Sequence, residues 1–315
     1  MKKIIALLLA LMLLVSLTAC QSADDGKLVV GVCQLVQHEA LDAATQGFCD
    51  ALKEEFGDDI EIIVENASND PATCSTIVNS FVTNNVDLIM ANATPALQAA
   101  AAATDSIPIL GTSVTEYGVA LNLDNISNGT GMNVSGTSDL APLDEQAAMI
   151  KEWFPDAKTV GLLYCSAEPN STYQVNTVKA ELESMGYTCE FYSFTDSNDI
   201  QMFANDAASN CDVIYVPTDN TAAAAKETIY EVCSAQGKPV IAGEEGICAG
   251  CGVATLSISY YDLGYTTGTM AIEILKNGKD VSTMPIEYAP ATKKYNPDIC
   301  QELGIEPLEG YVPIG

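Results

Sequence analysis

The most telling absence in this 315-residue chain is arginine. All 13 basic residues are lysines, against 42 Asp and Glu, which gives a formal net charge of −29 at pH 7. Such a surface repels phosphate backbones, so the composition argues against nucleic acid as a partner. Without a guanidinium fork, an anionic group of a ligand must be held by lysine, hydroxyls or backbone N–H groups at helix starts.

Histidine is almost as scarce, because His38 is the only one in the chain. A nucleophile-and-base triad needs a base beside the nucleophile, and no GxSxG, HExxH or phosphate-binding loop is present. We therefore expect no enzymatic activity. A hydrolase that uses carboxylates alone stays open at this point, because a paired acid and base cannot be located from the sequence.

Cysteine is abundant, with ten residues besides Cys20. In a protein exported from the cell, this many cysteines would favour disulfides. Cys33, Cys165 and Cys211, however, lie in or beside apolar runs, where cysteine serves as a small core residue. We expect mostly free thiols. The pair Cys248 and Cys251 has the spacing of a metal or redox motif, but no second pair or nearby histidine completes four zinc ligands, so we expect no metal and no cofactor. A local disulfide between these two cysteines stays open at this point.

The first residues form an export signal. Lys2 and Lys3 precede an apolar run over residues 4–17, which is shorter than the ~20 residues that cross a bilayer. The sequence Leu-Thr-Ala-Cys ending at Cys20 resembles the bacterial lipobox. We predict a signal peptide over 1–19, a lipid on Cys20 that fixes the protein to the outer face of the bacterial membrane, and a linker over 20–27. The alternative is an ordinary signal peptide followed by an incidental cysteine.

Apolar, β-branched segments alternate with helical patterns through the rest of the chain. Strands are predicted at 28–33, 60–65, 86–90 and 107–110, with helices at 39–55, 71–84 and 95–103 between them. After a polar stretch over 125–139 the same alternation of strands and helices resumes. Strands are predicted at 159–164, 188–192, 212–216 and 239–242. Helices are predicted at 142–153, 171–185, 198–208 and 221–236. Continuous apolar strands separated by helices predict parallel sheets covered on both faces. The fold class is therefore α/β, with two Rossmann-like lobes and a ligand cleft between them.

Polar residues gather where the predicted strands end and helices begin, which is where open α/β sheets bind ligands. In the first half these are Gln34, His38, Thr94 and Ser113, and in the second half Glu168, Ser171, Asp219, Asn220 and Thr221. Hydroxyls, amides and carboxylates thus line the expected cleft from both lobes.

Several of these segments together resemble one family of bacterial ABC-transporter solute-binding proteins, which includes tryptophan- and tyrosine-binding lipoproteins. They are VVGVCQLVQHEALDAATQGF, the ATPA turn, YCSAEPNS, VPTDNT and SYYDLGYTTGTMAIEIL. The resemblance implies the type I periplasmic-binding-protein fold with three crossovers. The first lobe would be 28–138 plus about 260–288, and the second 139–259 plus about 289–315.

The resemblance also implies capture of a small solute, such as an aromatic amino acid, and its delivery to an ABC permease with its ATPase. A module that presents ligand to a membrane sensor is the alternative, since fold does not decide function. For an amino acid, we assign the carboxylate to Thr94, Ser113 and Ser171 and the ammonium to Asp219 first and Glu168 second.

The remaining assignments have structural alternatives. Asn220 and Thr221 would bond the ligand or cap the following helix, and Gln34 and His38 would line the side-chain pocket. Thr94 and Thr221 are also good N-caps whatever the function, and Asp219-Asn220 could simply make a turn.

Overall fold

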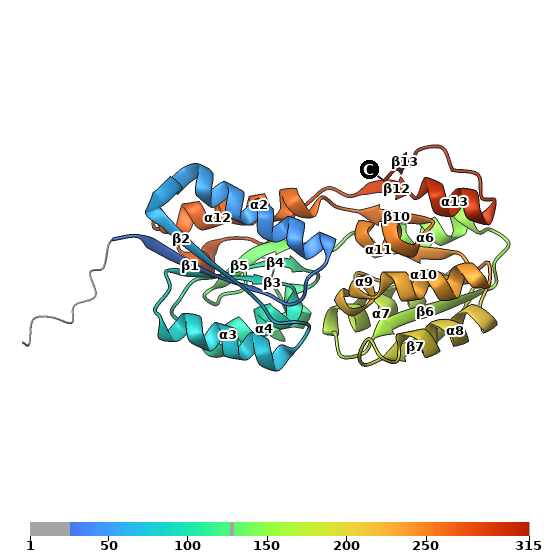
Figure 1. Cartoon of the computed structure of the whole chain (residues 1–315), viewed down its shortest axis with the longest axis horizontal. Coiled ribbons are helices and arrows are strands. Elements are labelled where there is room, and N and C mark those ends of the chain that lie inside the picture. Colours follow the sequence, from blue (N-terminus) through green and yellow to red (C-terminus); the bar gives the residue numbers. More distant parts are fainter. Residues whose placement is uncertain (1–25, 127–128, 315) are drawn as a thin grey trace, which may run out of the picture.

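The computed structural model describes residues 26–126 and 129–314, which form two α/β lobes side by side (Figure 1). The predicted signal peptide and Cys20 lie outside the described residues. Within those residues, no helix combines the length and apolar character needed to cross a membrane.

The first lobe is built on a six-stranded parallel sheet in the order β11-β5-β4-β3-β1-β2. Its strands are β1 (Leu28–Gln34), β2 (Ile60–Asn66), β3 (Leu88–Asn92), β4 (Ile109–Val114), β5 (Val134–Ser138) and β11 (Glu287–Tyr288). Its helices are α2 (Glu39–Phe56), α3 (Pro71–Thr83), α4 (Thr94–Ala103), α5 (Tyr117–Leu121) and α12 (Tyr260–Leu275), with short 3-10 turns at Gly57–Asp59 and Val281–Thr283.

The second lobe has a seven-stranded sheet in the order β13-β12-β10-β9-β8-β6-β7, in which only the β10–β12 pair is antiparallel. Its strands are β6 (Thr159–Cys165), β7 (Thr188–Phe194), β8 (Val213–Val216), β9 (Val240–Ala242), β10 (Ala254–Ser257), β12 (Thr292–Tyr295) and β13 (Val312–Pro313). Its helices are α6 (Leu143–Trp153), α7 (Pro169–Ser184), α8 (Ile200–Asn210), α9 (Asn220–Ala224), α10 (Lys226–Ala235), α11 (Glu245–Cys251) and α13 (Pro297–Leu303).

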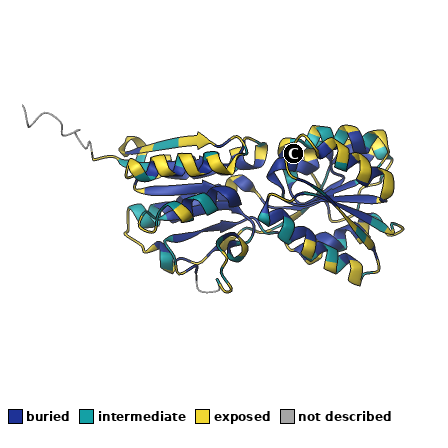
Figure 2. Cartoon of the chain, turned by 90° about the horizontal axis from the view of Figure 1, so that it is seen from below, coloured by how far each residue is buried: buried dark blue, intermediate teal, exposed yellow. Residues whose placement is uncertain are grey.

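Each sheet is covered by helices on both faces, so its central strands are buried throughout (Figure 2). In the first lobe, α2 and α12 pack on one face and α3, α4 and α5 on the other. In the second, α6 and α7 cover one face and α8 to α11 the other. The predicted two-lobed α/β class is confirmed.

Helix α2 shows why the sequence folds this way. Leu41, Ala44, Phe48 and Leu52 recur at helical spacing and are all buried against the sheet and α12. The helix ends at Gly57, whose φ of 56° suits a residue without a Cβ. Its first turn follows the short loop after β1, at the carboxyl ends of the strands, where the lobes meet.

Three connections join the lobes, from β5 to α6, from β10 to α12 and from β11 to β12. Two local predictions are corrected here. Residues 125–139, read as a polar break, contain strand β5. The predicted single helix over 221–236 is two helices, because Ala225 leaves the helical conformation at φ −123°.

The ten described cysteines are all free, and all but Cys189 are buried. Most of them therefore pack as small apolar side chains. Across residues 26–126 and 129–314, no three His, Cys, Asp or Glu side chains come together in a way that could hold a metal ion.

Candidate functional site

The carboxyl ends of the parallel strands in the two sheets face each other, and side chains from the loops there touch across the junction. His38, after β1, places Nε2 3.3 Å from Oδ1 of Asn220 at the start of α9. The Nδ2 of Asn69, after β2, donates to Oγ1 of Thr221 at 3.0 Å. This junction is where the strand-end rule predicted the ligand cleft.

Glu168 is the centre of the second lobe's part of the junction. Its carboxylate is buried and accepts five hydrogen bonds: from the backbone N–H (3.1 Å) and Nδ2 (2.7 Å) of Asn220, from the backbone N–H (2.9 Å) and Oγ1 (2.8 Å) of Thr221, and from Nδ2 of Asn170 (3.3 Å). Charge-assisted bonds of this kind are about twice as strong as neutral ones. Glu168 therefore ties the start of α7 to the start of α9.

Asp219 lies beside Glu168 and is the N-cap of α9. Its carboxylate accepts from the backbone N–H groups of Ala222 at 2.8 Å and Cys165 at 2.7 Å. Burial, and next the negative charge of Glu168, raise the pKa of Asp219 to about 7, while these two bonds and the Ser171 hydroxyl lower it. Both of its oxygens already have protein partners.

The first lobe contributes strained backbone at the ends of β3 and β4. Ala93 has φ 90° and ψ 158°, and Ser113 has φ 54°, both unusual for residues with a Cβ. Ala93, not Thr94, stands in the N-cap position of α4, and Thr94 opens the helix. The Ser113 Oγ is buried without a hydrogen-bond partner. Strain and an unpaired hydroxyl at one sheet edge are features of a ligand site.

Gln34 and His38 differ in where they point. The Gln34 side chain stays within the first lobe, donating to Asp42 Oδ1 (2.7 Å) and Val36 O (2.9 Å) and accepting from Thr45 Oγ1 (2.6 Å). The structure therefore does not bring it to the junction. His38 does reach the junction, where burial lowers its pKa and the bond to Asn220 opposes that shift.

Asp139, which follows β5 in the first crossover, was missed by sequence reasoning. It is buried, its Oδ2 accepts from the hydroxyl of Tyr260 at 3.0 Å, and its Oδ1 has no partner. Burial raises its pKa to about 6, and the nearby hydroxyls of Thr115 and Tyr260 oppose that shift. Little in the sequence indicates that Asp139 follows a strand, because only Val134 and Thr137 in β5 are β-branched.

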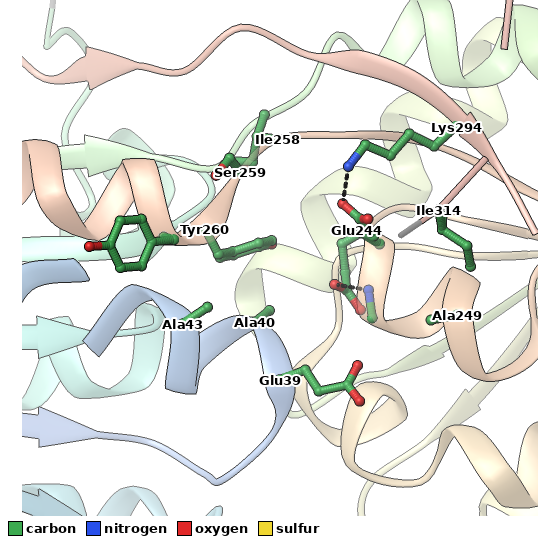
Figure 3. Close-up of a pocket in the computed structure, with 13 residues that line it drawn as sticks. Glu39, Ala40, Ala43, Glu244, Ala249, Ile258, Ser259, Tyr260, Lys294 and Ile314 are labelled. Atoms are coloured by element: carbon green, nitrogen blue, oxygen red, sulfur yellow. Dashed lines mark hydrogen bonds and ion pairs between the residues drawn. The ribbon is translucent and has the colours of Figure 1, made fainter. Parts of the chain in front are cut away.

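A cavity of about 300 Å³ adjoins the junction on the side of α2 and α11 (Figure 3). Both lobes and the crossover before α12 line it, with Glu39, Glu244, Tyr260 and Lys294 among its walls. Glu244 caps α11 by accepting from the backbone N–H groups of that helix, and burial raises its pKa to about 7. Tyr260 belongs both to this cavity and to the contact with Asp139.

Comparison with known proteins gives a family match along nearly the whole chain. The family model described as ABC transporter substrate binding protein matches residues 29–310. A tyrosine-binding protein of Clostridioides difficile is 34% identical over 98% of this chain and 94% of its own length. The two-lobed architecture is that of type I periplasmic binding proteins.

Two solved structures differ in how well they superpose. An ABC domain from Streptococcus pneumoniae in complex with L-Trp is 32% identical, with a TM-score of 0.86 over 91% of this chain and 99% of that one. A ligand-free, open substrate binding protein with adhesive properties from Clostridium difficile is 37% identical, yet its TM-score is 0.69 over 91% and 98%. This chain therefore superposes better on the L-Trp complex than on the ligand-free, open structure, and its lobes touch each other across the junction.

Proposed function

This chain belongs to the ABC transporter substrate-binding protein family, so it is the solute-binding component of a transporter and not an enzyme, and we propose that its solute is an aromatic amino acid such as tryptophan or tyrosine. The observation that carries the proposal is the likeness, over nearly the full length, to a tyrosine-binding protein and to a protein solved with L-Trp.

Asp139 is the best acceptor for the ammonium group of such a solute. Its Oδ1 is buried and unpartnered, whereas both oxygens of Asp219 and of Glu168 already accept from protein donors. Leaving a buried acceptor unpaired costs about 1–3 kcal/mol, which an ammonium N–H would recover. We therefore propose Asp139 ahead of Asp219 and Glu168, which hold the α9 segment in place.

The carboxylate of the solute would be held by the first lobe. With no arginine in the chain, the donors are the unpaired Oγ of Ser113 and the first backbone N–H groups of α4, which starts at Thr94. Ser171 lies on the opposite lobe at the start of α7, where its hydroxyl bonds Asp219. The solute would thus bridge both lobes.

Delivery follows from the family: the closed protein would dock on an ABC permease whose ATPase drives import. We propose that this happens outside the cytoplasm and that a lipid on Cys20 keeps the protein beside its permease. The lipobox-like sequence ending at Cys20 supports the anchor, and it lies outside the described residues.

The test is identification of the natural solute. Protein purified without added ligand is denatured and the released small molecules are identified by mass spectrometry. Calorimetry with L-tryptophan, L-tyrosine and L-phenylalanine then gives affinities, with L-lysine and L-glutamate as controls. Failure of all three aromatic amino acids to bind would overturn the aromatic assignment.

A further inference from the structure

Two contacts between the lobes lie at the side of the first sheet that is opposite β5 and β11. His38 and Asn69 follow β1 and β2, at one edge of the first sheet, whereas β5 and β11, which lead into the crossovers, form the opposite edge. Opening of the cleft by a rotation about the crossovers would break these contacts. An ion pair between Glu39 and Lys226 (2.9 Å) adds to them at the surface.

The backbone holds Asn69 ready for its contact. Ser68 and Asn69 both have positive φ (54° and 63°), and the loop is fixed by bonds from Ser68 N to Asn66 Oδ1 (2.8 Å) and from Asn69 N to Leu35 O (2.8 Å). Left-handed backbone in two consecutive non-glycine residues is costly unless the surroundings enforce it. The Asn69 amide is thus presented by its own lobe.

Glu168 fixes the polarity of the receiving groups. A carboxylate only accepts, so the single hydroxyl proton of Thr221 goes to Glu168 and its lone pairs face Asn69. For the same reason Nδ2 of Asn220 points to Glu168, which turns its Oδ1 toward the Nε2–H of His38. One buried charge in the second lobe therefore aims two acceptors at two donors in the first.

We propose that His38, Asn69, Asn220 and Thr221 form a lobe latch that closes the cleft without contacting the solute, with Glu168 as its positioning residue. The latch populates the closed state in the absence of solute and slows opening when solute is bound. The proposal rests on the proposed function only for the effect on solute release, because closure itself is measurable with no solute present.

The decisive measurement is the closed fraction of solute-free protein. Single-molecule FRET between dyes carried by non-canonical amino acids at exposed Glu65 and Asn198 reports the separation of the lobes without involving the native cysteines. Loss of one hydrogen bond should lower the closed-to-open ratio about fivefold. Asn69→Gly is the test variant, since glycine keeps the positive φ and removes only the amide.

A matched control exists in the same lobe. Asn85 also has positive φ (53°) and is exposed, and its side chain donates a hydrogen bond to the neighbouring Thr83 carbonyl, so Asn85→Gly should leave the closed fraction unchanged. Equal closed fractions in Asn69→Gly and Asn85→Gly would overturn the latch. Circular dichroism and urea unfolding confirm that each variant is folded before it is compared.

A double-mutant cycle tests the pairing and the role of Glu168. Asn69→Gly in a Thr221→Val background, or in a Glu168→Gln background, should cause no further loss of closure, because the acceptor is already lost or misdirected. Additive effects would refute the pairing. Stopped-flow release of L-tryptophan should be about fivefold faster in Asn69→Gly than in Asn85→Gly. If no aromatic amino acid binds, the proposed function fails while the FRET result still decides the latch.

Discussion

Replacing Asp139 with Asn should stabilise the solute-free protein and weaken solute binding at the same time. Burial raises the pKa of this carboxyl from 3.8 to about 6. The folded state therefore binds the proton more tightly than the unfolded state, and stability falls as pH rises from about 4 to about 6. Above that window the penalty is about 2 pKa units, or about 3 kcal/mol.

The Asn variant removes the buried charge and keeps an oxygen for the hydroxyl of Tyr260. Its new amide N–H groups replace the unpartnered Oδ1 of Asp139 and cost about 1 kcal/mol, so the net gain at pH 7 is about 2 kcal/mol. The gain should shrink as pH falls below about 6, where the wild-type carboxyl becomes protonated. Urea unfolding of solute-free protein between pH 5 and pH 8 measures it.

Binding should change in the opposite direction. A charge-assisted hydrogen bond to the ammonium contributes about 2 kcal/mol, so calorimetry should show aromatic amino acids binding about 30-fold more weakly to Asp139→Asn. Asp156→Asn, the same chemical change at an exposed position, is the control for both measurements. Unchanged affinity would remove Asp139 from the ammonium site, and a loss of stability would show that the charged form is needed for folding.

Three further predictions follow from the same structure. In wild-type protein, the affinity for an aromatic amino acid should fall about tenfold per pH unit below about pH 6, measured by calorimetry, because the proton on Asp139 must leave before an ammonium can bind. Gly264→Ala should destabilise the fold by about 2 kcal/mol in urea unfolding, since a Cβ there would lie 1.9 Å from the Ala44 carbonyl oxygen where α12 crosses α2, whereas exposed Thr269→Ala should not. Cys20→Ser should abolish palmitate labelling and membrane retention of the full-length protein in bacteria, and labelling of the variant equal to wild type would refute the anchor.

The central strands of both sheets could be predicted because they are apolar on both faces, as in β3 and β8. Strand β5 was missed for a physical reason: its buried residues include Ser135, Thr137 and Ser138, and polar side chains indicate a loop. They are buried because distant partners satisfy them. Ser135 donates to the carbonyl of Met284, 149 positions along the chain, and Thr137 bonds the hydroxyl of Thr267. Such pairings exist only once the chain has returned to the first lobe.

The same limit applies to the site. Whether a residue follows a strand can be predicted from local sequence, and this rule selected Glu168, Asp219 and Thr221. These three residues lie together in the structure. The role of each carboxylate depends on how many protein donors already reach it, and those donors come from elements some fifty residues away, as between Glu168 and Asn220. Asp139 differs from those carboxylates, because nothing in its neighbouring sequence marks it as a site residue. It is identified by its burial and by its one unpaired oxygen. A carboxylate surrounded by donors organises the protein, whereas one that lacks a donor is available to a solute. We therefore expect that the charge that binds the solute, on Asp139, and the charge that positions the contacts between the lobes, on Glu168, are separate. Each can be removed without the other.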